Sequence, residues 1–173
     1  DTLRKRISKN PKQNYLRFHN SESMSTGIYF LPKGGTDEQN PHGLDEIYYI
    51  VSGKAKFKAG KKSNTVSKGD VIYVDNKITH YFYDIEEDLT VFVFFSKSDP
   101  SNNDPDAHFF TSEDVDMGND KDKNVWNQFV DVSTLRTGNY MLPKTTGGDE
   151  TLTHEVDEIN LVLKGQGKFR MGD

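Results

Sequence analysis

The chain of 173 residues contains no cysteine. Disulfide bonds and thiolate metal ligands are therefore excluded, and the composition is typical of a protein kept in a reducing compartment. Long apolar runs are lacking too, so the sequence contains no candidate transmembrane helix and no hydrophobic core of a signal peptide. We therefore predict a cytoplasmic protein. Because the first residue is Asp1 and not methionine, a removed leader segment stays open as an alternative.

An excess of basic residues is also lacking. The chain has 22 Lys and Arg against 27 Asp and Glu, which gives a net charge of -5. Binding to nucleic acid or to an anionic membrane requires a basic surface, so neither partner is expected. What remains is a soluble globular protein that acts on a small molecule, with enough residues for one large domain or two small ones.

Short β-type segments, separated by clusters of Gly, Pro, Asn and Asp, begin at Tyr15 and continue to Ser96. Residues 54–59 alternate strictly between lysine and an apolar residue, which predicts a half-buried strand with lysine on the solvent face. Further strands are expected at Val71–Val74 and around His80. Helical periodicity is absent from this region. Regularly spaced short strands of this kind predict an all-β fold, either an antiparallel barrel or a sandwich.

Two segments do not follow the strand pattern. Residues 1–14 are basic and polar, and we interpret them as a solvated N-terminal arm. Residues 98–124 are rich in Asp and poor in apolar residues, which indicates an acidic linker with at most one ordered turn at 109–115. The predicted domains are therefore a first barrel over 15–97 and a second unit over 125–173.

The second unit repeats the first. A shift of 111 residues places Trp126 on Tyr15, and the string LPK recurs at 31–33 and 142–144. One inserted residue in the following turn changes the shift to 112, after which the string DEI at 45–47 recurs at 157–159. A match of this length with one insertion in a loop predicts a duplicated domain.

The second copy is shorter than the first. At Asp173 it has reached only the position that corresponds to Lys61. It would then contain the N-terminal half of a barrel, which exposes open strand edges and half a core. We expect that the chain continues beyond Asp173, in preference to the alternative that a partner completes the sheet.

Imidazole, amide and carboxylate side chains lie close together in residues 39–46. Asn40, His42 and Glu46 have the same parity, so they can converge on the interior of the barrel, where His80 from a neighbouring strand can join them. Two neutral imidazoles and one carboxylate bind a divalent metal and leave open positions. Such a site can hold an anionic oxygen ligand and, with a redox-active metal, O₂.

Two motifs in the first copy have the spacings H-x3-E-x6-G and G-D-x9-H. They consist of His42, Glu46 and Gly53, and of Gly69, Asp70 and His80. This pattern resembles the two conserved motifs of the cupins, which are small antiparallel β-barrels that often bind one metal inside the barrel. The resemblance implies two cupin-type, jelly-roll-like barrels (a bicupin), the second truncated at Asp173. It also implies metal ligands at His42, Glu46 and His80, while Gly53 is expected to serve a turn with positive φ.

The sequence departs from the cupin pattern at the first ligand position. The usual first motif begins H-x-H, but Asn40 occupies the place of the first histidine. Asn40, or Gln39 beside it, could ligate through an amide oxygen, which is a weaker ligand than imidazole. The second copy keeps His154 and Glu158 as candidate ligands but lacks similar neighbours, so we expect the chemistry in the first barrel.

By resemblance, the chain is a metal-dependent bicupin with one divalent transition metal (Fe, Mn, Ni or Zn). We expect an oxidoreductase similar to quercetinase, an O₂-dependent dioxygenase of a small organic substrate, with Glu46 as ligand and general base. The alternatives are a non-catalytic small-ligand or sugar-binding cupin and a metal-dependent sugar isomerase or epimerase, because a fold does not determine a reaction. A homodimer is also expected.

Overall fold

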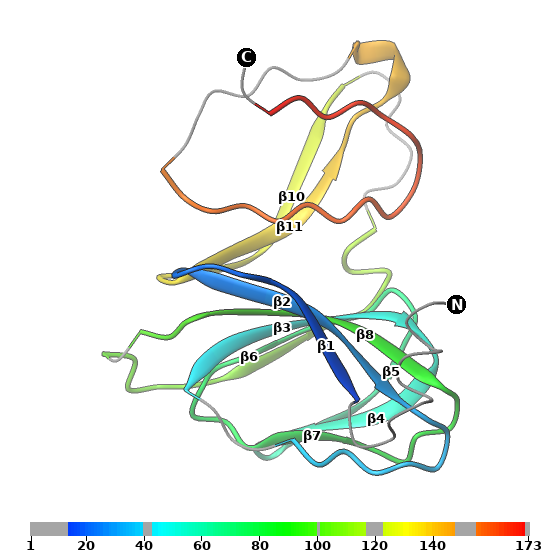
Figure 1. Cartoon of the computed structure of the whole chain (residues 1–173), viewed down its shortest axis with the longest axis vertical. Coiled ribbons are helices and arrows are strands. Elements are labelled where there is room, and N and C mark those ends of the chain that lie inside the picture. Colours follow the sequence, from blue (N-terminus) through cyan, green and yellow to red (C-terminus); the bar gives the residue numbers. More distant parts are fainter. Residues whose placement is uncertain (1–13, 40–42, 100, 117–122, 148–154, 172–173) are drawn as a thin grey trace.

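The computed structural model describes residues 14–39, 43–99, 101–116, 123–147 and 155–171 (Figure 1). In these residues the chain is all-β, as predicted from the sequence, with one short 3₁₀ turn, η1 (Lys144–Thr146). The strands are β1 (Tyr15–Asn20), β2 (Met24–Leu31), β3 (Leu44–Ser52), β4 (Lys54–Ala59), β5 (Lys62–Ser67), β6 (Val71–Val74), β7 (His80–Tyr83), β8 (Leu89–Lys97), β9 (Ala107–Phe110), β10 (Val125–Val132) and β11 (Leu135–Met141).

The first barrel consists of two antiparallel sheets. A six-stranded sheet has the order β1-β2-β8-β3-β6-β9, and a three-stranded sheet has the order β5-β4-β7. Figure 1 shows the two sheets facing each other in the lower part of the molecule. Apolar side chains from both sheets form one core cluster, in which Tyr48, Phe57 and Phe82 are each at most 1% exposed. Burial of such aromatic side chains is the main stabilising contribution to the barrel.

Strand β4 confirms the alternation read from the sequence. Ala55, Phe57 and Ala59 are buried in the core, while the three lysines that alternate with them are partly exposed. Lys56 makes an ion pair of 2.8 Å with Asp84 on the outer face. The predicted strand at Val71–Val74 is also present, with the same bounds, as β6.

The segment 98–124 is not a linker throughout. Ala107–Phe110 forms β9, which pairs antiparallel with β6 and is the edge strand of the six-stranded sheet. Four residues, AHFF, are enough for this because their apolar side chains pack on the barrel while their backbone covers the free edge of β6. The acidic composition of the whole segment gave no indication of this short strand.

Strands β10 and β11 form a separate two-stranded sheet above the barrel (Figure 1). Its register matches that of β1 and β2 at a shift of 111 residues: Trp126 pairs with Tyr140 where Tyr15 pairs with Tyr29. Both hairpins also have an irregularity in register at the same position, between residues 17 and 19 and between residues 128 and 130. The two hairpins therefore share pairing and bulge as well as sequence.

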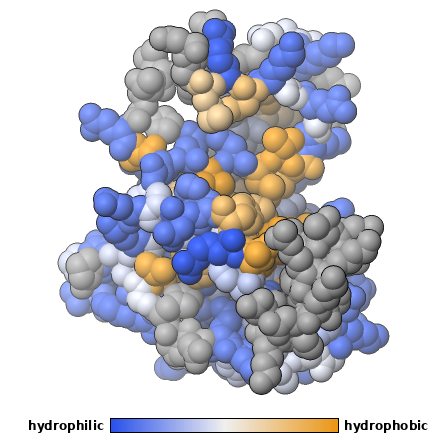
Figure 2. Space-filling view, in the orientation of Figure 1, coloured by the Kyte–Doolittle hydropathy of each residue, from blue (hydrophilic) through white to orange (hydrophobic). Residues whose placement is uncertain are grey.

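Residues 155–171 form no strand in the described part of the chain, although they correspond to β3 and β4. In the first copy β3 is paired on both sides, by β6 and β8, whereas residues 155–171 pair with no strand of the described residues. Several apolar side chains in this segment are consequently exposed, among them Val162, Phe169 and Met171. Figure 2 shows apolar surface in this upper part of the molecule.

No helix in the described residues has the length and apolar character needed to cross a membrane.

Candidate metal centre

Strand β3 places two polar side chains inside the barrel. Glu46 and Tyr48 are two residues apart, so they point to the same face, and both are 0% exposed. A carboxylate in this position is expensive to bury unless a cation or hydrogen-bond donors accompany it. The surroundings of Glu46 therefore decide what the site can do.

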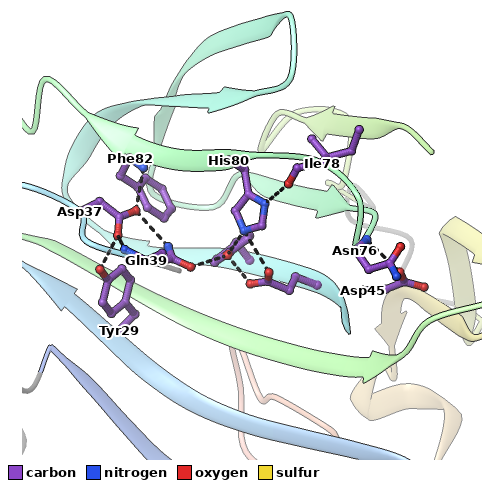
Figure 3. A network of polar contacts seen from close by, with 10 residues as sticks. Tyr29, Asp37, Gln39, Asp45, Asn76, Ile78, His80 and Phe82 are labelled. Atoms are coloured by element: carbon purple, nitrogen blue, oxygen red, sulfur yellow. Dashed lines mark hydrogen bonds and ion pairs between the residues drawn. The ribbon is translucent and has the colours of Figure 1, made fainter. Parts of the chain in front are cut away.

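The second element of the site is His80, the first residue of β7. Its Nε2 atom lies 3.0 Å from Oε1 of Glu46, and its side chain is only 6% exposed. On the other side of the ring, Nδ1 lies 2.7 Å from the carbonyl oxygen of Ile78 (Figure 3). The ring of Phe57 stacks on the imidazole at a centroid distance of 5.9 Å. The orientation of His80 is thus fixed from three sides.

The hydroxyl of Tyr48 lies at the centre of the site. It is 3.0 Å from Nε2 of His80 and 3.0 Å from Oε1 of Gln39, and it donates a hydrogen bond to Oε2 of Glu46. Burial and the neighbouring Glu46 carboxylate raise the pKa of Tyr48 well above its ordinary value. Tyr48 therefore stays protonated and has one hydrogen to share among these three acceptors.

The contact between Glu46 and His80 requires a cation. Because a backbone carbonyl can only accept, Nδ1 of His80 carries the hydrogen, and a neutral ring then directs the lone pair of Nε2 at the Glu46 carboxylate. Two facing acceptor atoms repel each other unless a proton or a metal ion lies between them.

The titration of His80 reflects this requirement. Burial lowers the pKa of His80, but the hydrogen bond and charge of Glu46 outweigh burial, so the pKa is raised. In the metal-free chain the stabilisation from this pair is therefore fully present below the ordinary pKa of histidine and is lost as the pH rises through the raised pKa.

A second carboxylate, Asp37, orients the amide of Gln39. Asp37 accepts hydrogen bonds from the hydroxyl of Tyr29 (2.5 Å), from the backbone NH of Phe82 (2.8 Å), and from both the backbone NH (3.1 Å) and side-chain Nε2 (2.9 Å) of Gln39. Since a carboxylate only accepts, the amide nitrogen must face Asp37, and the amide oxygen must face Tyr48 and the site (Figure 3).

The donor set fits a divalent transition metal. An imidazole nitrogen, a carboxylate and an amide oxygen face one another, and each is a known ligand type for such ions. Within the described residues no group of three or more His, Cys, Asp or Glu side chains is placed to hold a metal ion, so an amide oxygen is needed to complete the set. Two of the predicted ligands, Asn40 and His42, lie outside the described residues, so the residues available to hold the ion here are Glu46, His80 and Gln39.

Asp37→Asn should weaken metal binding by about 10- to 100-fold, as is typical when a residue that orients ligands is changed. The substituted amide would turn an NH₂ group toward donors and release the amide of Gln39. Titration of the metal against a chromophoric chelator measures the effect. Asp88→Asn is the matched control. Asp88 accepts a hydrogen bond from the backbone NH of Lys33, which lies in the same loop as Asp37, but this hydrogen bond does not involve Gln39. Equal affinities in both variants would show that Asp37 does not position a ligand.

The second copy places its predicted residues differently. Glu158 is exposed, and its Oε1 accepts a hydrogen bond of 2.9 Å from Asn160, the residue that corresponds to Tyr48. His154 lies outside the described residues. The predicted second site stays a prediction.

Sequence reasoning missed Tyr48 and Asp37. The signal for Tyr48 was present, since a residue two positions after Glu46 on a strand must share its face. Asp37 lies in a loop outside both motifs, and neither periodicity nor spacing distinguishes it from the many other acidic residues. Its role depends on β7 and β2 meeting the loop at one point, which only the fold reveals.

Comparison with known proteins agrees with the geometry. Residues 27–95 match the model of the cupin domain family, Cupin_2. An uncharacterised protein of Streptomyces coelicolor is 45% identical over 82 residues, which are 47% of this chain and 78% of that protein.

Solved structures show the same fold. The Cupin 2 conserved barrel domain protein from Leptotrichia buccalis has a TM-score of 0.54 at 16% identity, covering 69% of this chain and 52% of that one. Protein Ylba from E. coli has a TM-score of 0.50 at 18% identity, covering 60% of this chain and 47% of that one. The chain thus spans about half the length of these two structures. The matched residues and the antiparallel barrel that they form together identify the first barrel, over residues 27–95, as a cupin domain.

Proposed function

We propose that the first barrel binds one divalent transition metal between Glu46 and His80 and uses it to hold a small organic ligand. The observation that carries this proposal is the pair of facing acceptors, Nε2 of His80 and Oε1 of Glu46, at 3.0 Å, in side chains that are 6% and 0% exposed. A metal ion fills this position in place of a proton, and the amide oxygen of Gln39 takes the ligand position that the cupin pattern assigns to a histidine.

We further propose that the activity is an oxidation of a small hydroxylated substrate, of the dioxygenase kind found in quercetinase-like cupins. The bound ion would supply Lewis acidity and, for iron, manganese or nickel, access to one-electron chemistry. The chain's own residues bind and orient the substrate. Glu46 would accept the hydroxyl proton of the substrate at Oε2, and Tyr48, which stays protonated, would donate a hydrogen bond to the resulting anion.

A second candidate function is a binding protein in which the metal is structural. The observation that favours it is the position of Tyr48, whose hydroxyl contacts His80, Gln39 and Glu46 together. A phenol there occupies the space next to the ion that a substrate oxygen would need. In this case sugars or other small polyols would bind without being converted.

Residues 125–173 are, in our proposal, the N-terminal half of a second cupin copy, which makes the organisation that of a bicupin. The common register and bulge of the two hairpins support it.

One experiment separates the two functions. The full chain is loaded in turn with Fe²⁺, Mn²⁺, Ni²⁺ and Zn²⁺, and O₂ consumption is followed with a panel of flavonols and other hydroxylated aromatics. Turnover with a redox-active ion, absent in His80→Ala, supports the oxidoreductase. Metal binding without turnover for any ion would exclude it in favour of the binding protein, and a chain that takes up none of the ions would overturn both.

A further inference from the structure

The β10–β11 hairpin packs on the outer face of the first barrel. Phe129 contacts Phe110 at a ring distance of 5.2 Å, and Val130 is 4% exposed. These side chains join an apolar cluster with Ile47 and Tyr73 from the outer face of the six-stranded sheet. In Figure 1 the turn of the hairpin lies over the strands of this sheet. The second copy thus packs against the sheet that contains β3, the strand that carries Glu46.

The turn of this hairpin contacts β3 next to the site. Thr134 donates a hydrogen bond of 2.8 Å to Oδ2 of Asp45, which is 2% exposed. The other oxygen of Asp45 accepts the backbone NH of Asn76 at 3.1 Å (Figure 3). Asn76 lies in the turn between β6 and β7, directly before His80. Asp45 therefore joins three elements: the hairpin of the second copy, β3 with Glu46, and the turn that leads to His80.

The equivalent contact is also made from the first copy to the second. Asp157 corresponds to Asp45 at the shift of 112, and its Oδ2 atom accepts hydrogen bonds from Ser21, at 2.8 Å, and from Ser23. Both serines belong to the turn of the first hairpin, and Ser23 corresponds to Thr134 at the shift of 111. Each copy thus places a hydroxyl from its hairpin turn on the aspartate that precedes the motif glutamate of the other copy.

Reciprocity of this kind is the signature of a two-fold interface. In an isologous contact, residue i of one unit meets residue j of the other, and j meets i. Chance surface contacts between two units do not reproduce the same pair twice. The correspondence involves only the hairpin turn of each copy and the start of the segment that corresponds to β3.

We propose that the two copies face each other across a pseudo-two-fold interface within one chain, and that Thr134 is a positioning residue for the turn before His80. The second copy would then act on the first site by holding Asp45, which in turn holds Asn76. Asp45 and Glu46 are consecutive on β3 and point to opposite faces, so the hairpin reaches the site without entering it. This inference depends on the duplication but not on the metal.

The test compares Thr134→Val, which removes the hydroxyl at nearly constant shape, with Thr134→Ser, which keeps it. Hydrogen exchange of the metal-free full chain is measured over residues 75–80. Thr134→Val removes the hydrogen bond from Thr134 that holds Asp45, the acceptor of the Asn76 amide. We therefore expect this amide to exchange about threefold to tenfold faster in Thr134→Val and at the parent rate in Thr134→Ser. Unchanged exchange in Thr134→Val, or the same increase in both variants, would overturn the positioning role.

The reciprocal contact has its own test. Residues 155–171 contain trypsin sites at Lys164, Lys168 and Arg170. Ser21→Ala combined with Ser23→Ala should increase the rate of cleavage in this segment several-fold, while Ser63→Ala, an exposed serine on β5, should leave it unchanged. Equal cleavage rates in all three proteins would show that the interface is held from one side and is not two-fold. Neither readout involves bound metal, so failure here is distinct from failure of the proposed metal function.

Discussion

His80→Ala is expected to lower the affinity of the chain for a divalent transition metal by more than about 100-fold, beyond the loss seen when a residue behind a ligand is changed. The imidazole supplies the nitrogen that faces Glu46 at 3.0 Å. Alanine removes this ligand and leaves the buried Glu46 carboxylate with the hydrogen bond from Tyr48. Metal content by elemental analysis and affinity by calorimetric titration both measure this effect.

A matched control is available in His108. This histidine lies in β9, where its side chain is 55% exposed and stacks on Tyr73 on the outer face of the sheet. His108→Ala should retain metal like the parent. Circular dichroism and thermal unfolding of both variants separate loss of a ligand from loss of the fold. If His80→Ala folds and retains as much metal as His108→Ala, the ion does not bind at the proposed place.

Gly53→Ala is expected to destabilise the barrel by about 3 kcal/mol. This is the sum of two free-energy costs, that of a positive φ for alanine and that of the steric overlap of its Cβ atom. Gly53 has φ of 95° at the connection between β3 and β4. A Cβ atom there would overlap the carbonyl oxygen of Asp88 and lie 2.8 Å from Cα of Leu89. Backbone atoms at the start of β8 cannot move without disturbing the sheet. Urea unfolding of the metal-free protein gives the free energy.

Two glycines separate the backbone effect from the overlap. Gly165, the counterpart of Gly53, has nearly the same φ, 96°, but no atom within 4 Å of the added Cβ. Gly60 has φ of 56°, and Ile78 is 3.7 Å from its added Cβ. Alanine at either position should therefore show the conformational contribution alone, about 1–2 kcal/mol. A loss at Gly53 no greater than at Gly60 would show that contact with Asp88 is not the reason for glycine in the motif.

Much of the first barrel could be predicted because its strands obey simple alternation. The lysine rows of β4 and the bounds of β6 follow from period two and flanking turn residues. The meeting of Glu46 and His80, which lie 34 positions apart in the sequence, is expected from strand parity together with the resemblance of the two motifs to cupins. Gly53 also has the positive φ that its place in the motif predicts.

The remaining features depend on contacts between distant segments. The strand β9 forms because AHFF meets the free edge of β6, and a window of acidic composition does not contain that information. Asp37 becomes important because the loop, β2 and β7 bring donors to it from Tyr29, Gln39 and Phe82. The contact of Thr134 with Asp45 spans 89 positions and links the two copies. Tertiary contacts of this kind have no local signature in the sequence.

We propose that one cation, a proton or a metal ion, lies between Glu46 and His80. Calorimetric titration of the chain with Zn²⁺, in two buffers of different ionisation enthalpy and over a range of pH, counts the protons that the ion displaces. Below the raised pKa of His80 we expect the parent to release about one proton more per bound ion than His80→Ala, and we expect this difference to fall toward zero at higher pH. A difference that is the same at all pH values, or proton release that is the same in His80→Ala as in the parent, would contradict this proposal.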